Sequence, residues 1–135
     1  MLDKPTFIYN MDESGMPLDH KQLKRIALKG SKKVHGQASG NKFQVTIVAC
    51  ASAAGTVLPP MVIFIGERLN HKYTKGEVPG TLYGMSPNSW IDQELFCHRL
   101  SDLFLKHIPP QPVLLPLDGH STHFTPYAVH LAARQ

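Results

Sequence analysis

Acidic residues are missing from two stretches of this 135-residue chain. No aspartate or glutamate lies between Lys21 and Lys42, and none lies in the last 17 residues, from Gly119 to Gln135. The first gap leaves a run of basic side chains without internal neutralisation, which favours contact with a polyanion. The second gap means that a carboxylate site built near this end of the sequence takes its acids from earlier residues.

Cysteines and long apolar runs are also scarce. The two cysteines, Cys50 and Cys97, have no CxxC spacing, and we expect both to be buried free thiols. No apolar stretch approaches the roughly 18 to 20 residues of a membrane span, and the first residues lack the apolar core of a secretory signal. With 42% hydrophobic and 8% aromatic residues, the composition predicts one soluble, intracellular domain over residues 1–135, with no membrane partner.

The basic residues are concentrated in the first acid-free stretch. Seven of the 14 lysines and arginines lie there, namely Lys21, Lys24, Arg25, Lys29, Lys32, Lys33 and Lys42. We expect Lys32, Lys33 and Lys42 to contact DNA phosphates, with an affinity that falls as the salt concentration rises. Because no aromatic residues interleave with these bases for base stacking, a solvated basic face is the alternative interpretation.

The pattern of apolar residues predicts an α/β fold with three strands, a helix, a fourth strand and a second helix. The expected strands are residues 6–11, 43–51, 57–65 and 113–117. The first helix is expected to follow Ser89 as its cap and to stop at Pro109-Pro110, and the second to begin at Thr125-Pro126. Residues 13–41 are expected to be a connection rich in glycine and lysine, and residues 66–89 show neither period and are expected to be irregular. Pro59 and Pro60 place the start of the third strand at an edge.

Two aspartates close apolar runs. Asp12 follows residues 6–11 and Asp118 follows residues 113–117, and turn-forming residues come directly after each. The helix between them is expected to return the chain so that the fourth strand runs beside the first. Because adjacent strands lie ~4.8 Å apart, carboxylates at matching strand ends can share a hard divalent cation. The alternative is that each aspartate only caps a turn.

Four short strings resemble the DDE superfamily endonuclease domain of pogo, Tigger and jerky-type transposases and their domesticated relatives. They are Tyr-Asn-Met-Asp-Glu-Ser-Gly at 9–15, Gly-Gln-Ala-Ser-Gly-Asn-Lys at 36–42, Trp-Ile-Asp at 90–92 and Leu-Asp-Gly-His-Ser-Thr-His at 117–123. The resemblance covers nearly the whole chain. It implies an RNase H-like mixed sheet with flanking helices, and a nuclear protein descended from an enzyme that cuts and joins DNA.

The resemblance assigns the first two acids of a catalytic triad to Asp12 and Asp118. In such sites two Mg²⁺ or Mn²⁺ ions support in-line attack on a phosphodiester. The family's third acid lies on a later segment, so we expect a C-terminally incomplete domain with impaired cleavage. Glu13 is not expected to substitute, because neighbours on a strand point to opposite faces; the acids in expected connections are no better candidates, namely Asp19, Glu67 and Glu77.

Two histidines lie just beyond the second acid. His120 and His123 contact phosphate or metal in one interpretation, and cap the turn after the strand in the other. Pro116 departs from the aliphatic residue that the resemblance implies, and a proline in a central strand removes a ladder hydrogen bond.

An incomplete sheet would leave one unpaired side. We therefore expect a marginally stable fold in isolation, with a homo-oligomer or a partner chain completing the sheet. The functional alternative to a cleaving enzyme is a domesticated, non-catalytic nuclear module for DNA binding or assembly.

Overall fold

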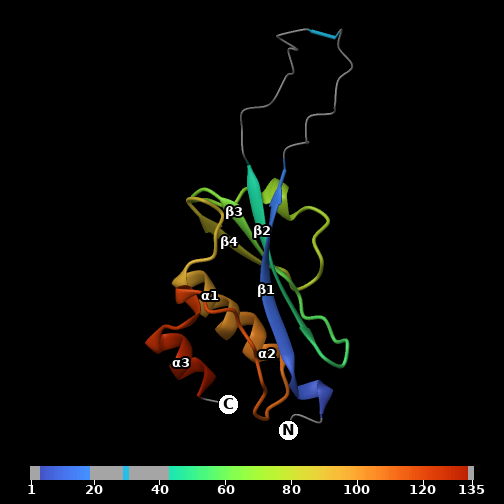
Figure 1. The fold of residues 1–135 in the computed structure, drawn as a ribbon, viewed down its shortest axis with the longest axis vertical. Helices are drawn as coiled ribbons and strands as arrows, with labels where there is room; N and C mark the ends of the chain where they lie inside the picture. The colour runs from blue at the N-terminus through green and yellow to red at the C-terminus, as the bar shows by residue number, and fades with distance from the viewer. Residues whose placement is uncertain (1–3, 19–28, 31–42, 134–135) are drawn as a thin grey trace.

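The computed structural model describes residues 4–18, 29–30 and 43–133. Within these ranges a four-stranded mixed sheet packs against helices, which confirms the expected α/β class. The sheet has the order β1-β2-β3-β4 (Figure 1), with β1 at Tyr9–Pro17, β2 at Gln44–Ser52, β3 at Met61–Ile65 and β4 at Leu82–Ser86. The first three strands are antiparallel neighbours, and β4 runs parallel to β3.

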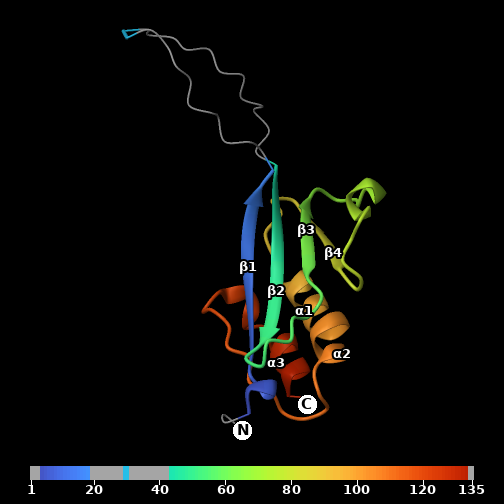
Figure 2. The ribbon, with the colours of Figure 1, turned by 90° about the vertical axis from the view of Figure 1, so that its right-hand side faces the viewer.

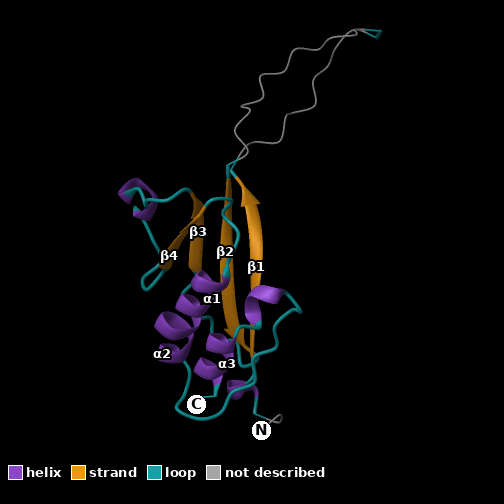
Figure 3. Ribbon diagram, turned by 90° about the vertical axis from the view of Figure 1, so that its left-hand side faces the viewer, coloured by secondary structure: helices purple, strands orange, loops and turns teal. Residues whose placement is uncertain are grey.

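The helices lie against one face of the sheet. α1 (Gln93–Arg99) continues through a π-helical turn, η3 (Leu100–Phe104), into α2 (Leu105–His107), and α3 (Pro126–Ala132) follows later. Figure 3 shows α1, α2 and α3 in front of the strands, and Figure 2, from the opposite side, shows the sheet in front of them. The short 3-10 turns are η1 (Pro5–Phe7), η2 (His71–Thr74) and η4 (Ser121–His123).

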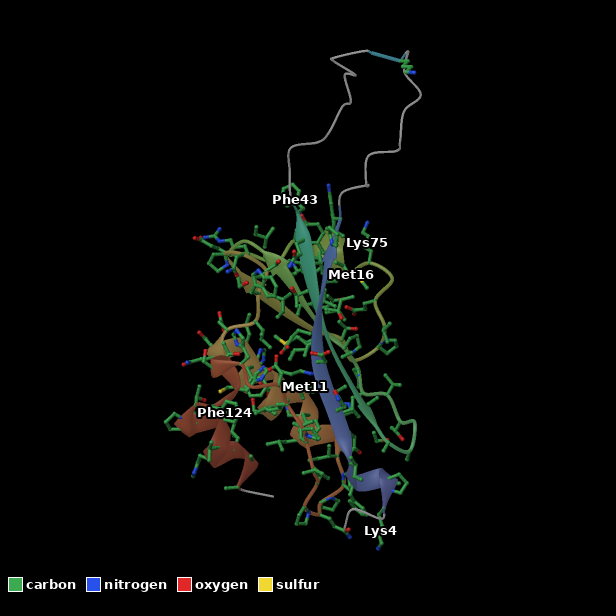
Figure 4. The ribbon with its side chains drawn as sticks, viewed as in Figure 1. Lys4, Met11, Met16, Phe43, Lys75 and Phe124 are labelled. Carbon is green, nitrogen blue, oxygen red and sulfur yellow. The ribbon has the colours of Figure 1, made fainter. Side chains whose placement is uncertain are left out.

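Strand alternation sorts the side chains between the two faces. In β1, Tyr9 and Met11 are buried against the helices, whereas Asn10 and Asp12 are exposed on the other face. Figure 4 labels Met11 in the first half of the strand. The core continues with Val48, Cys50, Met61 and Ile63 of the sheet and Phe96, Leu100, Leu103 and Phe104 of the helices. Both cysteines are buried free thiols, as expected, and burial raises the pKa of Cys50 to about 11.

A glycine brings β4 close to α1. A Cβ on Gly84 would stand 2.7 Å from Leu95 Cδ2 and 2.9 Å from Met61 Cε. These distances are shorter than van der Waals contact, so a larger residue here would force buried side chains to move. The glycine therefore allows the fourth strand to pack under the helix.

Three strands of the sheet differ from the prediction. β1 begins at Tyr9 and runs on to Pro17, paired with β2 throughout, so Asp12 lies in mid-strand rather than at a strand end. β4 lies inside residues 66–89, for which the sequence predicts no regular structure. β3 begins at Met61, after the two prolines, and lies between β2 and β4 rather than at an edge. The predicted second strand is confirmed with a shift of one residue.

The expected helices are confirmed, but the prediction of one cap is wrong. Asp92, not Ser89, caps α1, because its side chain accepts a hydrogen bond from Leu95 N at 2.8 Å. Ser89 is instead buried with a φ of 60°. Thr125 caps α3 as predicted, accepting from Ala128 N at 3.0 Å with Pro126 in the first turn.

Residues 113–117 make one parallel bridge to the start of β1 and do not form a strand. Leu114 is the bridge partner of Ile8; its N–H donates to Phe7 O at 2.8 Å, and its carbonyl accepts from Tyr9 N at 2.9 Å. The predicted parallel neighbourhood is thus confirmed at this point. Because alternate residues donate in a parallel ladder, residue 116 would donate next, but Pro116 has no N–H. The ladder stops at this position because proline has no backbone N–H to donate.

The core also holds an arginine. Arg99 is fully buried, and its Nη1 donates to Pro59 O at 2.8 Å. Its Nε and Nη2 have no partner among the described residues. Burial is the main cause that lowers the pKa of this guanidinium. A buried donor without a partner costs about 1 to 3 kcal/mol, and more when charged, so we expect Arg99 to lower the stability of the fold.

Candidate functional site

Asp12 lies on the sheet face that α1, α2 and α3 leave uncovered. It is exposed, and its Oδ1 accepts a hydrogen bond from the N–H of Glu13 at 2.9 Å. Its partner in the β1–β2 register is Ala49, which is also exposed. The first acid implied by the family resemblance is therefore accessible to solvent and to a ligand.

Asp118 lies beyond the Leu114 bridge, where the chain turns into η4. Its Oδ1 lies 2.9 Å from His123 Nδ1 and accepts from His120 N at 3.2 Å. The side chain remains 59% exposed. The carboxylate thus organises the turn that follows it, which is the capping role left open by the sequence.

His120 also has a structural role. Its ring caps η4, with Nδ1 lying 2.9 Å from Thr122 Oγ1 and accepting from Thr122 N at 3.5 Å. Of the two interpretations for this histidine, the described contacts correspond to the cap. Contact with phosphate or metal by His120 stays a prediction that these contacts do not test.

His123 is buried between two carboxylates. Its side chain is 2% exposed, with Nδ1 on Asp118 and Nε2 lying 3.2 Å from Glu13 Oε1. The ring also packs on Phe96, with centroids 4.5 Å apart. A neutral imidazole carries one N–H and can donate to one carboxylate, whereas the doubly protonated ring can donate to both. His123 therefore ties β1 to the turn after Asp118, and both ring nitrogens are engaged.

Glu13 is the residue that sequence reasoning set aside. It does face away from Asp12, as expected for neighbours on a strand. However, its side chain is only 16% exposed because the face it reaches is the one that holds His123. The partners are 110 positions apart in sequence, so alternation gave the direction of the side chain but not its contact.

The carboxylates of this region are the type of ligand that a hard cation prefers, but they are not placed around one ion position. Asp12, Glu13 and Asp118 offer the carboxylate oxygens that Mg²⁺ prefers. Within the described ranges, however, no three histidine, cysteine, aspartate or glutamate side chains converge on a possible ion position. The carboxylates as placed do not fit a metal ion, and the assignment of Asp12 and Asp118 as ligands stays a prediction.

The predicted DNA contacts Lys32, Lys33 and Lys42 lie outside the described residues. Of the seven basic residues from Lys21 to Lys42, here called the basic block, Lys29 is described, and it is exposed in a turn. The prediction that the block binds phosphates therefore remains open.

The α/β domain thus places one aspartate on β1 and a second just beyond the segment bridged to the residue before that strand. The chain belongs to the DDE superfamily endonuclease family, whose model matches residues 42–133. This match covers more than half of the sequence and confirms the family that the four strings indicated. It leaves the pogo, Tigger or jerky subtype open.

Over 125 residues the chain is 27% identical to a protein named MFS-type transporter clz9 from Cochliobolus lunatus. The alignment covers 86% of this chain and 13% of that protein, so the chain spans only a small part of its relative. In the part of the chain that the structure describes, no helix has the length and apolar character needed to cross a membrane. No solved structure matches the chain.

Proposed function

We propose that this chain is a transposase-derived DNA-binding domain of the pogo, Tigger or jerky type, with an RNase H-like fold and an ancestral cleavage site that is now impaired. It acts in the nucleus. The observation that carries this proposal is membership of the DDE superfamily endonuclease family over residues 42–133. An endonuclease domain acts on the phosphodiester backbone, which makes DNA the proposed partner.

We propose that Asp12 and Asp118 are the ligands that held Mg²⁺ or Mn²⁺ in the ancestral site. Each lies four positions beyond a partner of the Ile8–Leu114 bridge. A parallel ladder extended from that bridge would place the two aspartates opposite each other, ~4.8 Å apart. The bridge supports the pairing of these acids, and their chemistry suits the ions that the family generally uses.

The proposed impairment rests on Pro116 and His123. Pro116 lacks the N–H that would extend the ladder toward Asp118. The Asp118 carboxylate instead lies 2.9 Å from Nδ1 of His123. We infer that the second acid has been recruited to hold the turn, and that bringing it beside Asp12 would require breaking this contact.

The second candidate is a non-catalytic DNA-binding or assembly module. The link from Glu13 through His123 to Asp118 favours it, because these groups stabilise the fold without leaving a free acid pair. Beyond Tyr9, the outer edge of β1 has no paired strand among the described residues. A second copy or a partner chain could add a strand there, which keeps the proposal of an oligomer or completed sheet.

Salt titration of duplex DNA binding tests the proposal. If Lys32, Lys33 and Lys42 contact phosphates, replacing all three with alanine should reduce the slope of log affinity against log salt by about 2 to 3. A matched triple alanine variant at Lys4, Arg68 and Lys106 controls for net charge and should lower the slope by less. A parent chain whose weak binding does not depend on salt would refute DNA binding.

A further inference from the structure

The face of the sheet opposite α1, α2 and α3 carries a continuous row of side chains. The register pairs Asp12 with Ala49, and Ile47 with Val62, which in turn lies beside Tyr83 of β4. Paired residues point to the same face, and residues two apart along a strand do too. The row therefore leads from the proposed acid on β1 to β4, across the strands that Figure 2 shows in the order β1-β2-β3-β4.

Three aromatic rings stack at the far end of this row. Phe64 of β3 lies next to Tyr73 of η2, with centroids 4.8 Å apart and planes 21° from parallel. On its other side Phe64 lies 6.2 Å from Tyr83, with planes at 20°. Phe64 and Tyr83 are half-buried, but Tyr73 is 54% exposed. The stack thus runs from the half-buried rings of Tyr83 and Phe64 to the exposed ring of Tyr73.

Each end of the stack has charged neighbours. Lys72 and Lys75 lie on either side of Tyr73 in the sequence, and both are exposed; Lys75 lies toward the same end of the molecule as Met16 and Phe43 (Figure 4). At the other end, burial and then a hydrogen bond with Glu77 raise the pKa of the Tyr83 hydroxyl. The exposed ring therefore has an exposed lysine on each side of it in the sequence, while Glu77 acts on the hydroxyl of the inner ring.

We propose that the aromatic stack of Tyr73, Phe64 and Tyr83, with Lys72 and Lys75, binds single-stranded DNA. A base adds to the exposed ring of Tyr73, and the two lysines contact the adjacent phosphates. Single-stranded DNA fits because its base faces are free, whereas base pairing and stacking hide them in a duplex. The choice of DNA rests on the proposed function, and the stack gives a non-duplex strand a place on the same face as Asp12.

The test measures fluorescence anisotropy of a labelled oligo-dT in EDTA, with an abasic oligomer of equal length as the matched probe. Tyr73→Ala should bind oligo-dT about fivefold or more weakly than the parent, and Tyr73→Phe should bind like the parent. The abasic oligomer should bind all three proteins equally, since it has phosphates but no bases. Tyr127→Ala, which removes a similarly exposed tyrosine from α3, should leave the oligo-dT affinity unchanged.

The proposal is overturned if Tyr73→Ala binds oligo-dT as tightly as the parent, or if the parent does not distinguish oligo-dT from the abasic oligomer. In both cases duplex binding with a salt slope would leave the proposed function standing. A chain that binds neither duplex nor single strand would overturn both. EDTA removes divalent metal ions, so this binding comparison does not depend on whether the chain cleaves DNA.

Discussion

Replacing Pro116 with valine should lengthen the parallel ladder that now stops at Leu114. The bridge hydrogen bonds join Leu114 to Phe7 and Tyr9, so the next acceptor along β1 is the carbonyl of Tyr9. The introduced valine supplies the N–H that proline lacks, together with a β-branched side chain suited to a strand. The substitution also moves the chain toward a register in which Asp118 lies opposite Asp12.

The expected magnitude combines two opposing contributions. One added backbone hydrogen bond stabilises the folded state by about 0.5 to 1.5 kcal/mol. Loss of the proline ring increases the entropy of the unfolded chain, which costs about 0.4 to 1 kcal/mol. Global stability should therefore change by less than about 1 kcal/mol. Local opening of the bridge should become harder by about 1 kcal/mol, which is roughly fivefold slower amide exchange at Leu114.

Hydrogen exchange followed by NMR checks this prediction, with Pro110→Val as the control. Pro110 is exposed in the loop after α2 and faces no ladder acceptor, so its replacement reproduces the entropic effect alone. In the Pro116→Val variant the new amide at position 116 should be protected, and the Leu114 amide should exchange more slowly than in the control. Equal exchange at Leu114 in both variants would mean that the missing N–H of Pro116 does not end the ladder.

Three further predictions concern the core. Arg99→Met should raise the urea midpoint and stabilise the fold by about 1 to 4 kcal/mol, because it removes a buried charge with too few partners. The control Arg68→Met, at an exposed position, should change stability by less than about 0.5 kcal/mol. A lowered midpoint in Arg99→Met would mean that the buried guanidinium stabilises the fold. The pKa of Cys50 is raised from 9.0 to about 11, so its stabilising contribution is full below about pH 9 and is lost, by roughly 2 to 3 kcal/mol, as the pH rises to about 11. Urea unfolding from about pH 8 to 11 should show a steeper decline in the parent and in Cys97→Ala than in Cys50→Ala, and an identical slope in all three would exclude Cys50 as its source. Gly84→Ala should cost about 1 to 3 kcal/mol through overpacking against α1, and an unchanged thermal midpoint would show that the buried neighbours can yield.

Elements whose signals are local were predictable from the sequence. The β-branched run of β2 and the Thr125-Pro126 start of α3 determine their own conformations. β4 was not predictable, because its residues include Gly84 and show no alternation; pairing with β3 makes it a strand. The extension of β1 past Asp12 was not predictable either, because its residues have the local preference of a turn. Continuous pairing with β2 makes them a strand.

In the candidate site too, the local contacts were predictable from the sequence and the long-range contact was not. The turn after Asp118 and the cap made by His120 depend on residues two positions apart and could be anticipated. The contact between Glu13 and His123 could not, because it depends on which residue from the distant turn occupies the helix side of β1. Alternation correctly separated Glu13 from Asp12, but only the tertiary fold gave Glu13 its partner.

Nicking of supercoiled DNA in Mg²⁺ or Mn²⁺, under salt conditions where the chain binds DNA, measures whether the cleavage site is impaired. The parent chain should nick no faster than Asp12→Ala or Asp118→Ala, since the two carboxylates do not converge on a common ion. Metal-dependent nicking by the parent that each of the two substitutions abolishes would contradict the proposed impairment.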